Sequence, residues 1–312
     1  METTNVLGAT LDMGTTTSMH SAPRESGTRT HTPFVSLGIF PYLNIQPVYY
    51  GLLHKQVQVE EDSPINMVMG VPTRLNEALL HGEIDLSCVS SHAYINHCHE
   101  LLLIPRLSIS APGAVKSVLL FSRYADWYDL DGKKVAVTGH SASAVELLRV
   151  LSKYRYHIDL HFVTMPPNVE AMLTTCAAAL VIGDIALTEG IHHREMTGVG
   201  IPTIFDLGQE WAEWTGLPFV FGVWAARADR IDAIRSSGIV EQLYRSKVEG
   251  LAHLNDIGVE QAPRLGLTPA VCSDYLLQIT FDLSIPDLEG WRLFLKLSLP
   301  NFRWSDTQWL EM

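Results

Sequence analysis

The sequence FPYLNIQP, residues 40–47, decides the fold that we predict for this chain. The apolar, β-branched residues 34–39 that precede it are typical of a buried strand. Residues 48–53 continue as an amphipathic helix, and Pro47 suits the first turn of that helix. A strand that enters a helix through a short loop places this loop at the carboxyl edge of a sheet, where open α/β folds bind ligands. We therefore expect the amide of Asn44, which both donates and accepts hydrogen bonds, at a binding site.

Size, charge and cysteine usage limit the class of protein. With 312 residues, the chain is long enough for two lobes with separate cores. Its formal net charge of −12 argues against nucleic acid or an anionic membrane as a partner. No apolar run is long enough to span a membrane. No CxxC or zinc spacing occurs, which predicts reduced, buried thiols in a cytoplasmic protein for Cys88, Cys98, Cys176 and Cys272.

The first 33 residues differ from the rest. They are rich in Thr, Ser, Gly and Met and show no hydrophobic periodicity. They also lack the basic start and apolar core of a secretory signal. We therefore expect a disordered leader over residues 1–33.

From residue 34 onward, short apolar runs alternate with helical stretches, which predicts an α/β fold with mostly parallel strands. Helical patterns occupy residues 72–82, 144–151 and 168–176, and the chain is mainly helical from residue 229. The expected strands are 34–39, 57–60, 84–89, 101–104, 117–122, 134–137, 159–163 and 178–184.

Two segments mark crossings between lobes. The polar, turn-rich residues 126–133 follow the expected strand at 117–122, and a new α/β unit begins after them. The long apolar run 218–227 is expected to return to the first lobe. We therefore predict one discontinuous lobe, 34–122 plus 223–312, and one inserted lobe, 123–222. Two such crossings make a hinge with a cleft between the lobes.

Polar residues at strand ends are the candidates for ligand contact. The turn at 141–144 opens a helix, where free N–H groups and the helix dipole attract a carboxylate. The same serines can serve as helix caps, and Asp184 can instead orient a loop. The histidine pair 192–193 has no further ligands at metal-binding spacing, so we expect no metal. The substrate-binding candidates are Ser90, Ser91, Ser141, Ser143, Ala144, Gly183 and Asp184.

Six further segments, together with the loop at 40–47, resemble the MqnA/MqnD family of menaquinone biosynthesis by the futalosine route. The resemblance extends over roughly residues 34–300, and the ordered set is specific although each segment alone is weak. Within the family, the pattern is most similar to MqnA, the chorismate dehydratases. The segments are GEIDL (82–86), VSS (89–91), SVLLFSR (117–123), LVIGDIAL (180–187), DLGQEW (206–211) and WTGLPFVF (214–221).

The resemblance implies a two-lobed fold like that of type II periplasmic binding proteins, used inside the cell by an enzyme. It implies a hydro-lyase that converts chorismate to 3-[(1-carboxyvinyl)oxy]benzoate and water, the first step of the futalosine route, and we expect no cofactor. It also implies that Asn44 lies near the departing hydroxyl and Ser117 near the carbon that loses its proton. The expected partner is therefore a small dianion, whereas the sequence does not indicate the oligomeric state.

The proton acceptor stays open at this level. The loops around Asn44 and Ser90 contain no Lys, Asp or Glu, and the only such residue beside Ser117 is Lys116. Ser117, a water molecule or a carboxylate of the substrate can each take the proton, and we favour the carboxylate. The best alternative bases are His140 and then His92.

Two other functions are compatible with the pattern. One is an MqnD-like lyase that forms 1,4-dihydroxy-6-naphthoate from cyclic dehypoxanthinyl futalosine, and a histidine base in the cleft would favour it. The other is a solute-binding protein without catalysis. The missing export signal argues against this third possibility.

Overall fold

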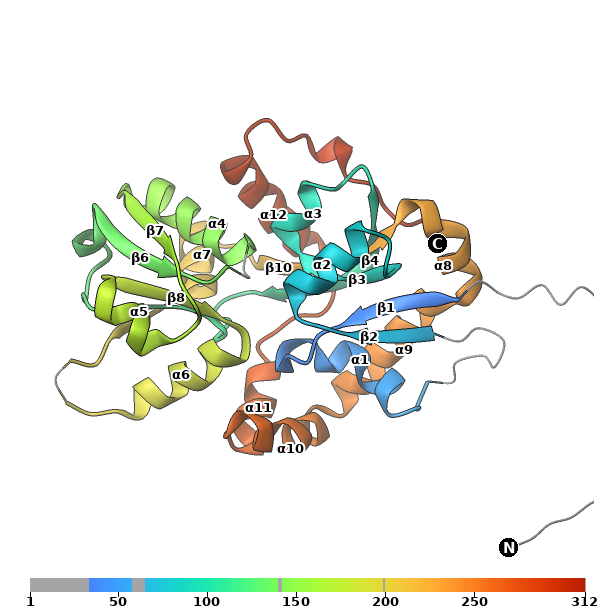
Figure 1. Cartoon of the computed structure of the whole chain (residues 1–312), viewed down its shortest axis with the longest axis horizontal. Coiled ribbons are helices and arrows are strands. Elements are labelled where there is room, and N and C mark those ends of the chain that lie inside the picture. Colours follow the sequence, from blue (N-terminus) through green and yellow to red (C-terminus); the bar gives the residue numbers. More distant parts are fainter. Residues whose placement is uncertain (1–33, 58–64, 140–141, 199, 312) are drawn as a thin grey trace, which may run out of the picture. The chain divides into compact units, whose positions relative to one another are not determined.

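The computed structural model describes residues 34–57, 65–139, 142–198 and 200–311. The leader expected at 1–33, Ser141 and His140 lie outside this part. Two five-stranded sheets organise the described residues (Figure 1). The first has the order β2-β1-β3-β10-β4, with strands Ile65–Met69, Val35–Ile39, Leu86–Ser90, Phe219–Arg227 and Leu101–Ala111. The second has the order β7-β6-β8-β5-β9, with strands Leu160–Thr164, Lys133–Val137, Ala178–Ile182, Val118–Ser122 and Thr203–Asp206.

The two sheets share one topology. In the first sheet β1 pairs in parallel with β2 and β3, and β10 runs antiparallel between β3 and β4. In the second sheet β6 pairs in parallel with β7 and β8, and β5 runs antiparallel between β8 and β9. Each antiparallel strand is the first strand after the chain has crossed from the other sheet. The mostly parallel α/β organisation that the sequence predicts is therefore confirmed.

The first crossing lies earlier in the chain than expected. Residues 118–122 pair with β8 and β9 of the second sheet, not with the first sheet in which we expected them. The chain crosses at 112–117 and returns at 216–218, and the two crossings adjoin where Ala111 pairs with Phe219. The polar stretch that suggested a linker instead contains the short helix η2 (Trp127–Leu130), in which Trp127 is buried and stacked on Tyr156.

Helices cover the sheets. In the first half of the chain these are η1 (Leu43–Ile45), α1 (Gln46–Leu53), α2 (Pro72–Leu80), α3 (Ser91–Ile95), α4 (Ala142–Val150) with a π-helical turn η3 (Leu151–Tyr156), α5 (Val169–Thr175), α6 (Gly183–Glu195) and α7 (Leu207–Thr215). After β10 follow η4 (Ala228–Arg230), α8 (Ile231–Ser237), α9 (Ile239–Ala252), α10 (Leu254–Leu265), α11 (Pro269–Leu276), α12 (Ile285–Ser298) and η5 (Trp304–Asp306). Among the described residues, no helix combines the length and apolar character that crossing a bilayer requires.

The strand, loop and helix predicted around residues 40–47 are present. β1 ends at Ile39, a 3₁₀ turn carries Asn44, and α1 begins at Gln46 with Pro47 in its first turn. A strand was expected at 57–60, but most of that range is outside the described residues, and the second strand is β2. Helix α1 packs closely on α9, because a Cβ at Gly250 would lie 2.0 Å from the carbonyl oxygen of Pro47.

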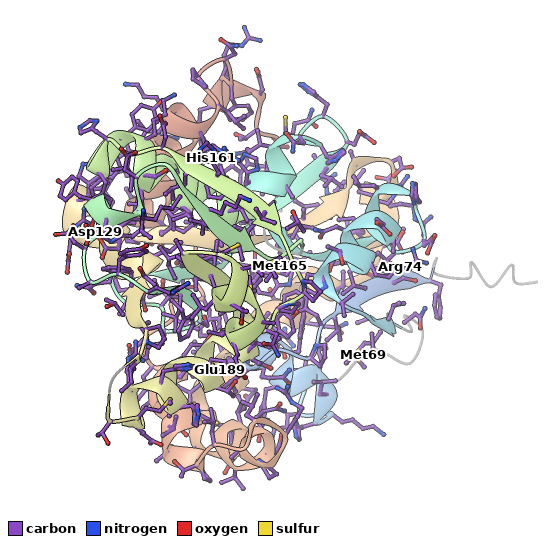
Figure 2. All side chains as sticks on the ribbon, turned by 60° about the vertical axis from the view of Figure 1, so that its left-hand side comes forward. Met69, Arg74, Asp129, His161, Met165 and Glu189 are labelled. Atoms are coloured by element: carbon purple, nitrogen blue, oxygen red, sulfur yellow. The ribbon has the colours of Figure 1, made fainter. Side chains whose placement is uncertain are left out.

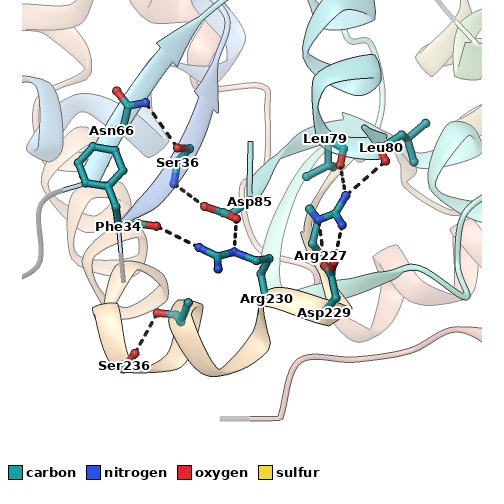
Figure 3. Close-up of polar contacts among 11 residues, drawn as sticks. Phe34, Ser36, Asn66, Leu79, Leu80, Asp85, Arg227, Asp229, Arg230 and Ser236 are labelled. Atoms are coloured by element: carbon teal, nitrogen blue, oxygen red, sulfur yellow. Dashed lines mark hydrogen bonds and ion pairs between the residues drawn. The ribbon is translucent and has the colours of Figure 1, made fainter. Parts of the chain in front are cut away.

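Polar contacts, partly buried at Asp85, join β1 to the turn after β10 (Figure 3). The carboxylate of Asp85 accepts a hydrogen bond from the N–H of Ser36 at 2.8 Å and one from Nε of Arg230 at 2.7 Å. Arg230 also donates to the carbonyl of Phe34 at 3.1 Å. Asp85 belongs to the GEIDL segment, and its carboxylate joins β1 to the turn after β10. This acidic residue is therefore structural.

Candidate functional site

A cavity lies between residues of the two sheets, with about 720 Å³ of space free of protein atoms when the solvent at its mouth is included. Its lining is mainly apolar and aromatic, with a few hydroxyl and amide groups. The apolar lining residues are Phe40, Tyr42, Pro72, Val89, Ile109, Val115, Val118, Ala144, Ile182 and Phe221, and the others are Asn44, Cys88, Ser90, Ser117, Ser143, Gly183 and Gly222.

Asn44 has a buried side-chain oxygen with unused hydrogen-bonding capacity. Its side chain lines the cavity from η1, and its Oδ1 atom is buried with no hydrogen-bond partner among the described residues. A buried amide oxygen without a partner costs about 1–3 kcal/mol of stability. A ligand with a hydroxyl or acid proton at this point would remove that cost.

Ser117 lines the same cavity from the opposite sheet. It is 2% exposed and lies directly before β5. Its hydroxyl accepts a hydrogen bond from the phenol of Tyr275 at 2.8 Å, and its carbonyl accepts the N–H of Gly183 at 2.7 Å. Two residues 73 positions apart in the chain, Asn44 and Ser117, therefore meet at one cavity (117 − 44 = 73).

Asp206 fixes the backbone of the crossing segment that precedes Ser117. Its carboxylate accepts the N–H groups of Val115 and Lys116 at 3.0 and 2.6 Å, and two more from Gly208 and Gln209 at the start of α7. Lys116 has a φ of 58°, an unusual angle for a residue with a side chain. Burial raises the pKa of Asp206, while the four N–H groups oppose that rise. This carboxylate shapes the backbone and does not line the cavity.

The serines at the other side of the cavity bond to one another. Ser143 Oγ lies 2.7 Å from Ser90 Oγ and 3.0 Å from Ser91 Oγ, and it accepts the N–H of His92 at 3.0 Å. Ser91 donates its proton to the carbonyl of Val220 at 2.5 Å. Because each hydroxyl has one proton, Ser143 must donate to Ser91, and Ser90 must donate to Ser143.

This serine cluster (Ser90, Ser91 and Ser143) joins the two halves of the described structure. Ser143 belongs to α4, beside the second sheet, and the other two serines lie where β3 meets α3. Ser90 also caps α3 by accepting the N–H of Ala93. Ser91 is fully buried and does not line the cavity, contrary to the ligand contact that we expected, because its hydroxyl is committed to Val220 and Ser143.

Asp184 is the second residue whose position differs from the expectation. It does not line the cavity, because one carboxylate oxygen accepts the N–H of Leu43 at 3.0 Å and the other binds Arg264 at 2.7 Å. These contacts join α6 to η1 and α10, next to the loop that carries Asn44. Asp184 therefore positions the Asn44 loop from the outside.

Gly183 lines the cavity with its backbone. Its φ of 66° favours glycine, and a Cβ at this position would lie 3.4 Å from the ring of Tyr42. Its N–H is occupied by the carbonyl of Ser117, so this group is not free for a ligand. Ala144 is the third residue of α4, and its N–H lies in the first turn, where N–H groups lack a helical partner.

None of the described residues that line the cavity is charged. Figure 2 labels two of the charged side chains, Arg74 on α2 and Asp129 on η2, and both are exposed. His92 does not line the cavity, and burial lowers its pKa, so its imidazole is neutral near pH 7. Across the described residues, no three His, Cys, Asp or Glu side chains are grouped to hold a metal ion.

Several site residues escaped the sequence analysis. Phe40 and Tyr42 line the cavity and belong to the stretch 40–47. Their closeness to Asn44 in the sequence could therefore have predicted their place in the site. Phe221 and Gly222 lie in the apolar run that we read as a crossing only. Tyr275 lies in a helix without any motif, and nothing local connects it with Ser117, 158 residues away.

Comparisons with known proteins identify relatives of this chain. A family model described as menaquinone biosynthesis matches residues 35–298. A Thermus thermophilus protein named chorismate dehydratase is 32% identical over 278 residues, which are 86% of this chain and 96% of that protein. A 1,4-dihydroxy-6-naphtoate synthase from the same organism is 27% identical over 219 residues, 70% of this chain and 74% of that protein.

Solved structures support the fold. A crystal structure from Archaeoglobus fulgidus has a TM-score of 0.67 at 18% identity and covers 86% of this chain and 98% of its own. The alkanesulfonate-binding protein of Xanthomonas axonopodis pv. citri has a TM-score of 0.61 at 18% identity, with 85% and 91% covered. The fold is thus the α/β, periplasmic-binding-protein-like fold. From the family match and the 32% identical relative together, the chain belongs to the menaquinone biosynthesis family that includes chorismate dehydratase.

Proposed function

We propose that this protein is a chorismate dehydratase, which removes water from chorismate to form 3-[(1-carboxyvinyl)oxy]benzoate. The observation that carries the proposal is that Asn44 and Ser117 line one cavity whose described lining is uncharged and largely apolar. The 32% identical relative named chorismate dehydratase, matched over nearly its full length, supports it. In the futalosine route to menaquinone, this reaction is the first step.

The reaction breaks two bonds on the ring. The C–H bond at the carbon that bears the enolpyruvyl ether breaks, and its electron pair forms a new ring double bond. The neighbouring C–O bond breaks, and the hydroxide that leaves becomes water with the abstracted proton. Since the product is aromatic, the protein needs mainly to orient the ring and to stabilise the charge that develops.

We assign the departing hydroxyl to Asn44 and the carbon that loses its proton to Ser117. The amide N–H₂ of Asn44 can donate to the leaving oxygen, and its buried Oδ1 can accept the proton of that same hydroxyl in the ground state. The hydroxyl of Ser117, which lines the same cavity, can donate to the charge that develops as the ring carbon loses its proton. A preorganised donor of this kind is worth about 3 kcal/mol in a dry site.

A carboxylate of the substrate is our proposed proton acceptor. The described lining residues offer no Asp, Glu, Lys or His side chain for this task. The buried thiol of Cys88 is a poor base, because burial raises its pKa and keeps it protonated, so the thiolate is scarce. The substrate brings its own carboxylates, one of which lies on the enolpyruvyl ether beside the reacting carbon.

Neutral donors must hold this dianion, because none of the described lining residues is charged. We assign one carboxylate to Ser143 and Ala144, which line the cavity from the first turn of α4, because the free N–H groups and the dipole at a helix start attract an anion. Ser90 can turn its proton from Ser143 to the ligand. The four cysteines are free and buried, as a reducing compartment requires, and we place the reaction in the cytoplasm.

The alternative within the family is a naphthoate-forming lyase. The 27% identical relative supports it over a shorter part of the chain. A histidine base in the cavity would favour it, and the described lining has none. A solute-binding protein would use the same fold and cavity to hold a ligand without turnover.

Incubation of the purified chain with chorismate tests these three functions against one another. A dehydratase consumes chorismate and forms the aromatic ether, which absorbance and mass spectrometry follow separately. Tight binding without a product would support a solute-binding protein. Turnover of cyclic dehypoxanthinyl futalosine, with chorismate left intact, would support the naphthoate-forming lyase and overturn our proposal.

A further inference from the structure

Tyr275 touches the site without lining it. The side chain is 2% exposed on α11 and is not among the residues that form the cavity wall. Its phenol donates a hydrogen bond to Ser117 Oγ at 2.8 Å. The two residues are 158 positions apart, so the contact joins the C-terminal helices to the crossing that carries Ser117.

The direction of this bond decides what Ser117 can do. Because Tyr275 donates, the hydroxyl of Ser117 accepts on one lone pair and keeps its own proton for another acceptor. Among the described residues, that proton meets only the carbonyl of Val115 at 3.4 Å, which is beyond the usual length of an O–H···O bond. The proton of Ser117 is therefore available to a group in the cavity.

The environment keeps Tyr275 in the donor role. Burial raises the pKa of its phenol far above the ordinary value, and the charges of Asp184 and Asp206 raise it further. The phenol is therefore protonated near neutral pH. A group that does not release its proton is not a relay, so orientation of Ser117 is the role left to it.

We propose that Tyr275 is a positioning residue for the dehydration, and that its phenol turns the hydroxyl of Ser117 so that the Ser117 proton points to the reacting ring. This inference rests on the proposed function. It predicts that loss of the phenol affects turnover through Ser117 alone, and that substrate binding is nearly unchanged.

A double-mutant cycle tests the inference. Tyr275→Phe should lower kcat by about tenfold, the value of one lost hydrogen bond of about 1.4 kcal/mol, and leave KM within about twofold. In a Ser117→Ala background the same change should lower kcat no further. Single-turnover rates at excess enzyme extend the measurable range for the slow Ser117→Ala variants.

Tyr94→Phe is the matched control. Tyr94 is equally buried, and its hydroxyl donates to the carbonyl of Gln308 at 3.1 Å, away from the cavity residues. Its loss should reduce the free energy of unfolding and leave kcat unchanged, whereas Tyr275→Phe should change both.

Two results would overturn the inference and leave the function intact. One is a wild-type level of kcat in Tyr275→Phe, and the other is an equal loss of kcat in both backgrounds. A wild-type protein that binds but does not convert chorismate would instead overturn the proposed function, and this inference with it.

Discussion

The two polar sides of the cavity differ in how their hydrogen bonds are satisfied. In the serine cluster, every hydroxyl proton has a protein acceptor, and the chain of bonds ends on the carbonyl of Val220. On the other side, the Oδ1 atom of Asn44 has no described partner, and the proton of Ser117 has only a long contact with Val115. Both sides are built from short polar residues at the ends of strands.

This difference distinguishes residues that stabilise the fold from residues that can bind a ligand. A polar group whose bonds are complete within the protein contributes to stability and to the relative position of the elements it joins. A buried donor or acceptor without a hydrogen-bond partner lowers the free energy of unfolding unless a ligand supplies the partner. The serine cluster therefore stabilises the contact of α3 with α4, and Asn44 and Ser117 keep the hydrogen-bonding capacity that our proposal assigns to the reacting ring.

The largest effect is expected at Asn44 and Ser117, the residues whose hydrogen bonds are not completed within the protein. Asn44→Ala should lower kcat by about 10²–10³, since a preorganised donor at a developing charge is worth about 3 kcal/mol, and Ser117→Ala should act similarly. Affinity for the product should change much less. Steady-state kinetics and calorimetry with the product measure the two quantities. Asn66→Ala, an exposed amide on β2, is the control and should leave kcat unchanged. Unchanged turnover in both site variants would refute the assignment.

The next largest effect is expected in the serine cluster. Ser143→Ala leaves the N–H of His92 and the hydroxyl of Ser90 without their acceptor, and should reduce the free energy of unfolding by about 2–3 kcal/mol. Ser90→Ala removes a helix cap and should cost about 1 kcal/mol. Denaturant unfolding measures both, with the exposed Ser236→Ala as control. An equal loss of unfolding free energy in the two cluster variants would contradict the order of donation that we derive, from Ser90 to Ser143 and from Ser143 to Ser91.

A smaller effect concerns the support of the Asn44 loop. Asp184→Ala removes the acceptor for the N–H of Leu43 as well as the partner of Arg264, and should raise KM and cost about 1–2 kcal/mol of stability. Arg264→Gln removes only a partly exposed ion pair, worth about 0–1 kcal/mol, and its effect should shrink in added salt. If Arg264→Gln has the larger effect on KM, the N–H of Leu43 is not what Asp184 holds in place.

The smallest effect depends on pH. Burial lowers the pKa of His92 below its ordinary value of 6.5, so the unfolded chain binds a proton here more readily than the folded one. Stability from this group is therefore complete above pH 6.5 and is lost as the pH falls from 6.5 toward the folded pKa. His92→Gln should reduce the loss of stability between pH 7 and 5.5. An identical pH dependence in wild type and variant would show that His92 titrates normally.

Local patterns predicted the strand, turn and helix around Asn44, because a buried strand and a helix start are each encoded within about ten residues. They also indicated five of the cavity-lining residues, Asn44, Ser90, Ser143, Ala144 and Gly183, and the family resemblance implied a sixth, Ser117. They did not distinguish Ser90 from Ser91. Adjacent residues at a strand end point in different directions, and only the position of α4 decides which of them faces the cavity.

The sequence by itself determined the α/β class, the presence of two lobes and, through its resemblance to a family, the chemistry to expect. Only the tertiary structure decided that residues 118–122 join the second sheet, that Asp184 supports a loop, and that Tyr275 reaches Ser117. The physical reason is range. Hydrophobic periodicity and capping act between near neighbours in the chain, whereas strand pairing and buried hydrogen bonds join residues that meet only after the lobes have packed.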